Sequence, residues 1–565
     1  MSHEIQKVTC QNHNISKHCQ GEFTIEPDDF VFYKKIKVPP PTFCPECRTQ
    51  RAMVWRNETT LYSGNKCNLC NKSVLTMYNP KSDFIIYCNS CYRGDKWEPR
   101  DYAMDYDFSK SFFEQFEDLM RKVPKNALYN TSGAGLIVDS PYNNCVGGLK
   151  NCYMCFNSAN LEDCMYSRGV TRSKEVLDSY FCKKIENCYE AINTYNSVNS
   201  FWIQNSNDIL DSIFLYDCAN VSNCLGCVNL RNKSFCILNE QYSKEEYFSF
   251  LNKIKGSYSN LENFRNQFIS LTKSLPKRAN QNIKTMDCVG DYLTECKNVK
   301  HGFEVMNSED CKRIYFGRDI KDSRGTIGYG IKSELLLECV STGYTSRAIG
   351  CWACELSQDL EYCVSCFPSN KNLIGCDSMR NSQYCILNKQ YSKEEYEKIK
   401  IHINEELTVL GVYGLMLPSE ISPFSYNETL AQDNYNLSEE EVLKEGFVWE
   451  KDIQMTSGKE TADINSLVDN INETSEDICK EILACIDCNR NYKITEQEFY
   501  FYKNKIIPVP RKCFYCRHQS RIVKRGSLRF DKEICNKCNI DIYTNLNPKD
   551  GDIVYCEKCY QQKVY

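Results

Sequence analysis

The chain has 565 residues, including 37 cysteines; 25% of the residues are charged and the formal net charge is −5. This length exceeds what one hydrophobic core can serve, so we expect roughly three or four domains. No apolar run reaches the ~18 residues of a membrane-spanning helix. The negative net charge also excludes attraction of the whole protein to nucleic acid or an acidic membrane, so any such binding requires a local patch.

The N-terminal residues, Met1–Ile5, are polar and lack the basic-then-apolar pattern of a secretory signal. We therefore expect a cytoplasmic protein. In a reducing compartment its cysteines are thiols or metal-bound thiolates rather than disulfides.

Residues 1–96 contain paired Cys-x-x-Cys knuckles and predict a double zinc ribbon. Each knuckle is a tight turn that aims two sulfurs at one point, and two knuckles complete a tetrahedral thiolate shell, which suits Zn²⁺. A closed four-sulfur shell leaves no position for water, so these sites are expected to be structural. The predicted ligands are Cys10, Cys19, Cys44 and Cys47 in one site, and Cys67, Cys70, Cys88 and Cys91 in the other.

The fourth ligand of the first site is the least determined. The position where a knuckle cysteine is expected holds Ser16, which cannot bind zinc. Cys10, His13 and His18 are the candidates on this longer loop. We favour Cys10 because a thiolate matches the other ligands, with His13 second; His18 adjoins Cys19, and neighbours do not easily aim at one ion.

Residues 97–140 predict a linker with one helix. Ser109 is the expected N-cap, ahead of an apolar face that includes Phe112 and Phe116.

A small-residue repeat dominates the segment that follows. Asn, Asp or Glu precedes Cys or Ser, as in Asn151-Cys152 and Asn187-Cys188, mostly at a 12-residue interval. Small residues that recur at the same position of each repeat predict a β-solenoid. Its Cys and Ser side chains would stack inside, with Asn and Asp at the corners. The spacing leaves open whether one such interval makes a whole coil or half of one.

The repeat region is itself duplicated, which predicts two solenoid halves at 141–280 and 281–410. The segment Cys236–Tyr247 recurs as Cys385–Tyr396, and each copy ends in a Ser-x-x-Glu capping box. Capping helices are therefore expected near 243–275 and 392–407. The solenoid also contains Cys-x-x-Cys pairs, which we interpret mainly as packed small residues. Further metal sites are the alternative, above all at Cys351, Cys354, Cys363 and Cys366.

Residues 411–480 predict a loop, a helix start at Ser438 and a flexible tether near 451–476. Residues 481–565 then repeat the N-terminal layout: 25 residues separate Cys19 from Cys44 and Cys488 from Cys513. We predict a second double zinc ribbon, which brings the total to about four structural Zn²⁺ ions. Its ligands are Cys485, Cys488, Cys513 and Cys516, and Cys535, Cys538, Cys556 and Cys559.

Basic residues concentrate in this last module. We expect the candidates for nucleic-acid contact to be Arg517, Arg521, Lys524, Arg525 and Arg529. The alternative is that these cations offset the negative charge of the four-sulfur sites.

Three segments carry a resemblance to a known group: Val38–Arg48, Cys224–Lys233 and Ser422–Thr429. Together they resemble large cysteine-rich zinc-ribbon and repeat proteins of uncultured candidate-phylum bacteria and large DNA viruses. Some of these carry a CoA-transferase label that their sequences do not support. The resemblance spans nearly the whole chain and implies terminal zinc ribbons around a Cys-rich repeat core, in host cytoplasm or a virion if the source is viral. Ser16 departs from the pattern.

The overall prediction is a mainly β fold with tandem zinc ribbons at each end, flanking a duplicated Cys/Ser-ladder β-solenoid with capping helices. No metalloprotease, P-loop or catalytic-triad motif occurs, so we expect no enzyme and no small-molecule substrate. Three functions compete: a zinc-stabilised scaffold that recognises another macromolecule, a nucleic-acid or ribosome-associated factor, and, least favoured, a thiol redox enzyme. The sequence leaves the partner, protein or nucleic acid, and the oligomeric state undetermined, and predicts no membrane association.

Overall fold

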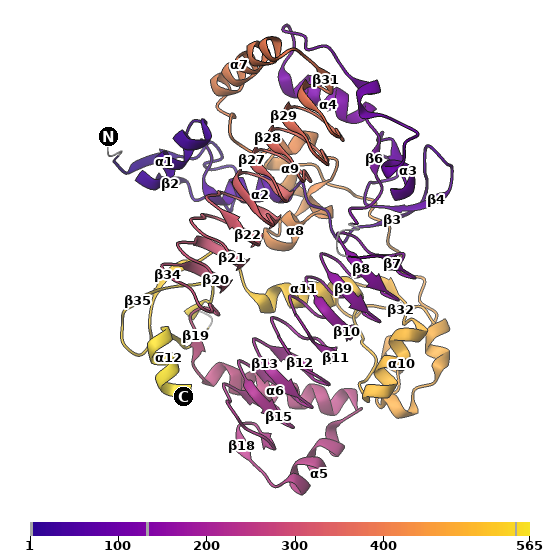
Figure 1. Cartoon of the computed structure of the whole chain (residues 1–565). Helices are drawn as coiled ribbons and strands as arrows, with labels where there is room; N and C mark the ends of the chain where they lie inside the picture. Colours follow the sequence, from indigo (N-terminus) through magenta and orange to yellow (C-terminus); the bar gives the residue numbers. More distant parts are fainter. Residues whose placement is uncertain (1–3, 131–134, 549–550, 565) are drawn as a thin grey trace. The chain divides into compact units, whose positions relative to one another are not determined.

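Parallel β-sheets form the largest elements of the computed structural model, which describes residues 4–130, 135–548 and 551–564 (Figure 1). The chain divides into two units that cut across sequence order. Unit 1 combines the N-terminal module (residues 4–96) with a parallel ladder at 289–390, here the second ladder. Unit 2 combines the C-terminal module (residues 481–564) with a parallel ladder at 137–241, the first ladder. The segments of unit 1 are Met1–Leu128, Asn280–Lys451 and Leu528–Phe530, and those of unit 2 are Tyr129–Ala279, Asp452–Ser527 and Asp531–Tyr565.

The first ladder advances by one 12-residue step at a time, the interval read from the sequence. Leu149 pairs in parallel with Leu161, and Leu161 with Ser173, so each step brings the chain back beside itself. The register therefore assigns one step of the ladder to each repeat interval. Its main sheet consists of β7 (Ile137–Val138), β8 (Gly147–Lys150), β9 (Ala159–Glu162), β10 (Thr171–Leu177), β11 (Glu186–Tyr189), β12 (Phe201–Gln204), β14 (Ile213–Tyr216), β16 (Leu225–Val228), β17 (Cys236–Ile237) and β18 (Glu240–Gln241), beside the pair β13 (Asn207–Leu210) and β15 (Ala219–Ser222).

Within each step the backbone repeats every three residues. Asn151, Met154, Asn157 and Asn160 all have φ near +50°, and the residue after each of these turns is directed inward. Asn and Asp tolerate this left-handed conformation better than most residues, which explains their frequency before Cys and Ser. The 12-residue interval was predicted from the sequence, whereas the three-residue period was not.

Cys and Ser fit the interior because they are small and also satisfy the backbone. Ser158 donates its hydroxyl to the Phe156 carbonyl at 2.8 Å and accepts the Val170 N–H at 3.0 Å. Cys155 donates its thiol to the Cys164 carbonyl at 3.3 Å. A buried backbone group left unpaired would cost stability, so these contacts stabilise the narrow interior.

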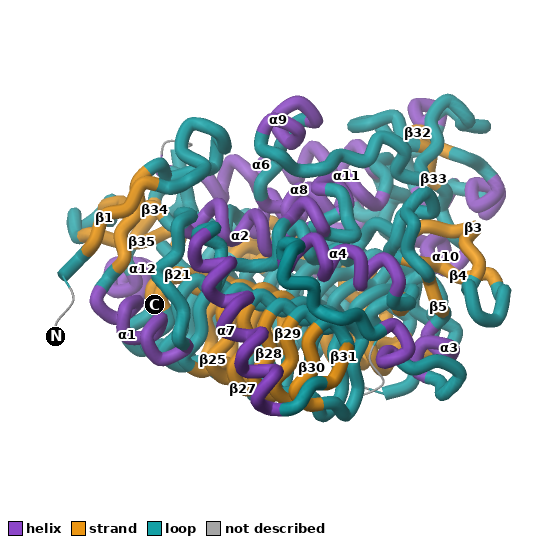
Figure 2. The backbone as a smooth tube through the Cα atoms, turned by 90° about the horizontal axis from the view of Figure 1, so that it is seen from above, coloured by secondary structure: helices purple, strands orange, loops and turns teal. Residues whose placement is uncertain are grey.

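The second ladder follows the same plan in two parallel sheets, and Figure 2 shows α7 (Lys393–Val409) beside its strands. One sheet contains β20 (Val289–Thr294), β21 (Lys300–Met306), β22 (Tyr315–Gly317), β24 (Ile327–Tyr329) and β26 (Val340–Thr342). The other contains β23 (Ile320–Lys321), β25 (Ser333–Leu337), β27 (Ser346–Ile349), β28 (Gln358–Glu361), β29 (Lys371–Ile374), β30 (Gln383–Ile386) and β31 (Lys389–Gln390).

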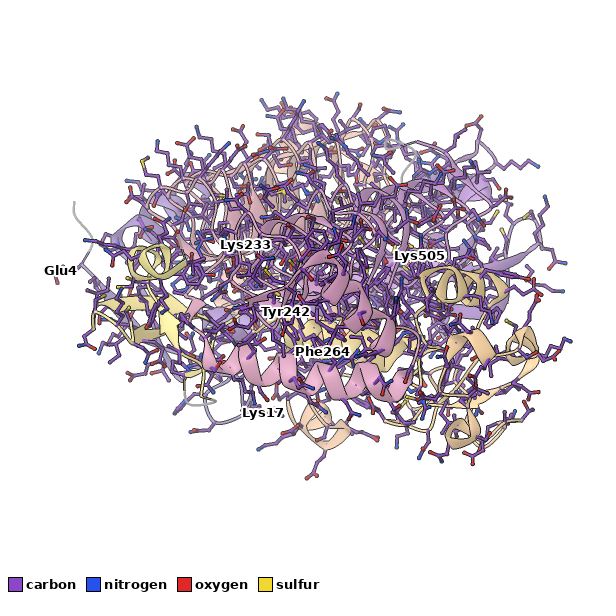
Figure 3. All side chains as sticks on the ribbon, turned by 90° about the horizontal axis from the view of Figure 1, so that it is seen from below. Glu4, Lys17, Lys233, Tyr242, Phe264 and Lys505 are labelled. Carbon is purple, nitrogen blue, oxygen red and sulfur yellow. The ribbon has the colours of Figure 1, made fainter. Side chains whose placement is uncertain are left out.

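Helices follow each ladder where the capping boxes predicted them. Ser243 caps α5 (Lys244–Ile254) and Ser392 caps α7, each accepting the backbone N–H three residues later. The first predicted helix is in fact two, because the chain turns at Gly256, with φ +86°, before α6 (Tyr258–Ser274). Phe264 of α6, marked in Figure 3, lies 6.1 Å from the Phe214 ring of the first ladder, centroid to centroid.

The linker helix starts two residues later than predicted. Ser111, not Ser109, caps α4 (Phe112–Lys122) and accepts the Glu114 N–H. Ser109 instead donates its hydroxyl and backbone N–H to the Asp107 carboxylate at 2.7 and 2.9 Å. The Asp107 carboxylate therefore competes for the Ser109 hydroxyl, and Ser111 caps the helix instead.

The predicted tether is partly ordered. It includes two 3₁₀ turns, Ile464–Ser466 and Ile471–Glu473, and Ile471 is fully buried. Lys503 donates to the carbonyls of Ile471, Asn472 and Thr474 at 3.0–3.1 Å, which holds this segment against α10 (Glu496–Lys505).

The two terminal modules have matching elements. Each contains two antiparallel hairpins with helices after them. The N-terminal module comprises β1 (Gln6–Thr9), β2 (Glu22–Ile25), α1 (Pro27–Ile36), α2 (Pro45–Met53), β3 (Tyr62–Lys66), β4 (Ser73–Thr76), β5 (Ile86–Tyr87) and α3 (Asn89–Arg93). The C-terminal module comprises β32 (Leu483–Ala484), β33 (Asn491–Tyr492), α10, α11 (Phe514–Arg525), β34 (Asp531–Ile534), β35 (Asp541–Thr544), β36 (Val554–Tyr555) and α12 (Glu557–Val564).

Two short helices, α8 (Leu430–Asn434) and α9 (Glu439–Lys444), follow the second ladder, and Ser438 caps α9 as predicted. Among the described residues, no helix has the length and apolar character needed to cross a membrane.

Candidate metal centres

Four groups of four cysteines converge within the described parts of the chain. In each group the sulfur atoms all lie within 4.8 Å of one another. Two groups belong to each terminal module, which agrees with the predicted number of sites. The groups are Cys10, Cys19, Cys44 and Cys47; Cys67, Cys70, Cys88 and Cys91; Cys485, Cys488, Cys513 and Cys516; and Cys535, Cys538, Cys556 and Cys559.

The sulfur spacing fits a tetrahedral ion. One Sγ–Sγ distance is 3.9 Å in each N-terminal group and 3.7 Å in each C-terminal group. Four sulfurs bonded at ~2.3 Å to a central ion stand ~3.8 Å apart along the edges of the tetrahedron. The donor set and its spacing therefore suit a metal that prefers four thiolates.

In three of the four groups the first knuckle lies in a hairpin turn closed by asparagine. Asn71, Asn489 and Asn539 follow the second cysteine directly, adopt φ near +60°, and donate their N–H groups to the carbonyl of the first cysteine at 2.8–3.0 Å. This turn brings the two sulfurs of the knuckle together. Sequence reasoning missed these residues, although Asn after Cys-x-x-Cys at three places was a readable signal.

The second knuckle begins a helix. Cys44, Cys88 and Cys513 are the N-cap residues of α2, α3 and α11, and Cys556 directly precedes α12. The positive end of a helix dipole stabilises thiolates, which are the metal-binding form of cysteine.

Backbone amides favour the thiolate at the first cysteine as well. The Cys88 N–H donates to Cys67 Sγ, and the Cys556 N–H to Cys535 Sγ, both at 3.3 Å. Burial raises the pKa of these thiols, but amide hydrogen bonds outweigh it and lower the pKa of Cys67 and of Cys535 to about 6. The same balance lowers the pKa of Cys485 to about 7.

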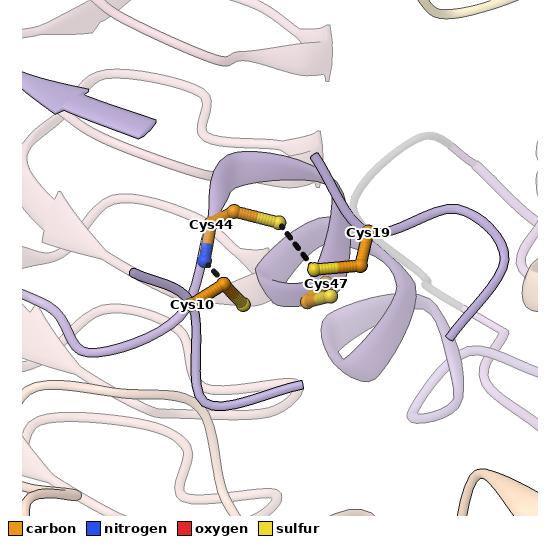
Figure 4. Close-up of side chains that lie close together, drawn as sticks. All are labelled: Cys10, Cys19, Cys44 and Cys47. Atoms are coloured by element: carbon orange, nitrogen blue, oxygen red, sulfur yellow. Dashed lines mark hydrogen bonds between the residues drawn. The ribbon is translucent and has the colours of Figure 1, made fainter. Parts of the chain in front are cut away.

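In the first site the structure brings Cys10 together with the other three cysteines (Figure 4). The Cys44 N–H donates to Cys10 Sγ at 3.1 Å, repeating the contact made at the other sites. His13 and His18 do not belong to the convergent group. The His18 ring instead packs edge-on against Tyr435 at 5.2 Å, where burial lowers the imidazole pKa.

The cysteines of the ladders serve as interior packing. Cys351 and Cys354 are fully buried and donate to the carbonyls of Ile349 and Trp352 at 3.3 and 3.5 Å. Cys363 and Cys366 are buried in the same way. Among the described residues these four cysteines form no convergent group of the kind found in the modules.

Three of the five arginines and lysines proposed for nucleic-acid contact are buried. Arg517, Arg521 and Arg525 are only 1–5% exposed, because α11 packs against the first ladder. Arg517 forms an ion pair with Asp178 at 2.9 Å, and Arg521 pairs with Asp178 at 2.9 Å and with Glu190 at 3.2 Å.

Arg525 donates to the Tyr180 hydroxyl at 3.1 Å. Lys524 is half-exposed and pairs with Glu190 at 3.3 Å, and Arg529 is exposed. Arg517 and Arg521 therefore bind carboxylates of the ladder instead of facing solvent, whereas Arg529 remains exposed.

The N-terminal module is anchored by equivalent residues. Arg48, which follows Cys47 as Arg517 follows Cys516, pairs with Glu338 of the second ladder, and both side chains are at most 4% exposed. Asp29 of α1 pairs with Lys312 at 2.8 Å and Arg324 at 3.3 Å. The carboxylates and cations contributed by the ladders were not found from the sequence, because nothing local marks them.

Comparison with known proteins identifies no family: no family model and no curated protein matches the chain. One similar solved structure is described as a "putative acetyltransferase" from Desulfovibrio desulfuricans G20, with 9% identity over 42% of this chain and 62% of that chain. This chain therefore matches less than two thirds of that structure's length. The TM-score is 0.10, too low to carry an argument about fold or function.

Proposed function

We propose that this protein is a non-catalytic scaffold, stabilised by about four structural Zn²⁺ ions, that recognises another macromolecule. The observation that carries the proposal is the set of four closed four-cysteine groups, two in each module. Such shells satisfy a tetrahedral ion completely and offer no site for water or substrate. Zinc suits four thiolates and has no redox chemistry of its own.

The ladders are the second component of the scaffold. We propose that they are β-solenoids in which each 12-residue step is one coil, supported by the parallel registers and by the inward Cys and Ser side chains. A solenoid presents long, regular side-chain columns, and such extended surfaces are the usual binding faces of repeat proteins.

The nucleic-acid alternative is weakened by the buried arginines. Arg517, Arg521 and Arg525 were its main support, and each now has an intramolecular partner. The redox alternative is weakened because most ladder thiols are buried, and burial raises the pKa of Cys188 and Cys218 to about 12. Neighbouring thiols lower the pKa of Cys152 to about 4, but its side chain is only 2% exposed.

The test is purification of the full chain under native, reducing conditions, followed by elemental analysis and mass spectrometry of co-purifying molecules. The proposal expects about four zinc ions per chain and a bound protein or nucleic acid that survives washing. Replacing Cys535 and Cys538 by Ser should lower the zinc content by one ion. A metal-free, folded chain would contradict the proposal, as would a thiol that reacts rapidly with iodoacetamide in the metal-loaded protein.

A further inference from the structure

One side of the first ladder contains a shallow groove of about 490 Å³, which we call the ladder groove. It runs across four successive steps of the ladder, from β8 to β11. One column of side chains along it is Lys150, Glu162, Lys174 and Glu186, one from each step. A second column, two residues earlier in each step, contributes Arg172 and Lys184.

The first column has two cations and two carboxylates, and its two lysines are paired with one of those carboxylates. Lys150 and Lys174 both approach Glu162, at 2.9 and 3.8 Å. Hydrogen bonding and charge attraction from Lys150 lower the pKa of the Glu162 carboxyl, so it stays ionised.

The second ladder repeats this column. There Lys297 and Lys321 approach Glu309 at 3.0 and 3.8 Å. Glu334 occupies the same column one step after Lys321. Because lysine and glutamate alternate along this column in both ladders, we interpret the alternation as a feature of the ladder fold rather than of one binding site.

The second column differs between the ladders. In the first ladder it places Arg172 and Lys184 on adjacent steps; both are exposed, and neither pairs with another described side chain. The equivalent positions of the second ladder are Asp319 and Lys332, also on adjacent steps with positive φ. The duplication has therefore kept the first column in both copies and created two unpaired cations in only one.

We propose that the ladder groove binds an extended, acidic peptide segment of a partner protein. The proposal rests on the scaffold function above and specifies its partner. Arg172 and Lys184 would pair with carboxylates of the peptide, and the first column would lie beside it. Two unpaired cations within adjacent steps produce a local positive charge that the second ladder lacks, which gives selectivity between two otherwise similar faces.

Charge complementarity favours a peptide over nucleic acid. A nucleic-acid backbone is negative at every phosphate, so it is repelled by Glu162 and Glu186, which lie in the groove on alternate steps. A peptide can alternate its carboxylates with neutral side chains and can donate hydrogen bonds from N–H or hydroxyl groups. It can therefore meet both the cations and the carboxylates of the groove.

The test is fluorescence anisotropy of full-length, zinc-loaded protein with a fluorescein-labelled (Glu-Ser)₅ peptide, and in parallel with a labelled ten-nucleotide oligouridylate. We expect saturable, salt-sensitive binding of the peptide and weaker binding of the oligouridylate. Combining Arg172→Asp with Lys184→Glu should weaken peptide binding by about tenfold or more, since two attractions become repulsions. The matched control, Lys332→Glu in the second ladder, should leave affinity unchanged within about twofold.

Circular dichroism and zinc content of each variant check that the fold is intact, which is expected because these side chains are exposed. Equal peptide affinity for the double variant, no peptide binding up to about 1 mM, or tighter binding of the oligouridylate would each overturn the groove proposal. The scaffold proposal fails separately, on zinc content or on a reactive thiol, so the two failures are distinguishable.

Discussion

Arg521 donates to Asp178 at 2.9 Å across 343 residues of sequence, and both side chains are at most 1% exposed. The same arginine reaches Glu190 one ladder step away. This contact joins a helix that begins at a four-cysteine site to the ladder of the same unit. The C-terminal module is therefore held by buried charge as well as by its own cysteine groups.

Arg521→Ala should loosen this attachment. The change leaves Asp178 and Glu190 short of a partner in a buried site, and breaking such a pair costs about 3–5 kcal/mol. Hydrogen exchange of the α11 amides should therefore speed up strongly. The control is Val523→Ala on the same helix, which is 71% exposed and should have little effect. Similar exchange rates in the two variants would contradict the assigned role of Arg521.

Asp29→Asn should destabilise the N-terminal module. Burial alone would raise the pKa of Asp29, but Arg313, Lys312 and Arg324 lower it to about 2. Because the folded pKa is below the unfolded value, the stabilisation is present above pH ~4 and is lost as pH falls towards 2.

At pH 7 the loss for Asp29→Asn should be about 2 kcal/mol, measured by urea unfolding. Asp28→Asn is the matched control, because it removes the same charge from a side chain that is 60% exposed and lies farther from Lys312 and Arg324, at 3.9 and 3.6 Å. An equal loss in both variants would point to general acidity of α1 rather than to the buried ion pairs.

Removal of metal should unfold the terminal modules before the ladders. The modules depend on four-cysteine sites, and a structural zinc contributes an apparent ~10–16 kcal/mol to folding at pH 7. The ladders have their own interior of Cys, Ser and aliphatic side chains. Treatment with a strong chelator, followed by limited proteolysis, should yield protected fragments within 137–241 and 289–390. Readdition of Zn²⁺ should restore protection of the ends; unchanged protection after chelation would be contrary to this expectation.

Cys10→Ser should lower the metal content from about four ions per chain to about three, or markedly weaken the fourth ion. Its sulfur lies within the convergent group, whereas the His13 ring does not. His13→Ala is therefore the control and should keep all the metal. Elemental analysis after dialysis against a mild chelator measures the difference. Loss of metal from the His13 variant alone would assign the fourth ligand to the histidine.

Local signals predicted the parts of the fold that depend on local contacts. Ser243 and Ser392 were readable as helix caps because the capping box closes within three residues. The prediction of Ser109 as the N-cap was wrong, because the Ser109 hydroxyl donates to the Asp107 carboxylate. The Phe112 N–H at the start of the helix donates to Glu406, 294 residues away. The sequence nevertheless contained the signal: Ser111 precedes Glu114 by three residues and so matches the Ser-x-x-Glu capping pattern, which Ser109 does not.

The cysteine spacing by itself determined three of the four candidate metal centres, because both sulfurs of a Cys-x-x-Cys knuckle come from one turn. In the first centre only the tertiary structure brought Cys10, rather than His13 or His18, to the other three cysteines. The sequence also determined the 12-residue interval of the first ladder, because small residues that point inward recur at that interval along the chain. Only the tertiary structure decided which module packs on which ladder, and that Arg517 and Arg521 are buried. Those outcomes depend on carboxylates such as Asp178 and Glu338, which look like ordinary surface residues until folding brings an arginine beside them.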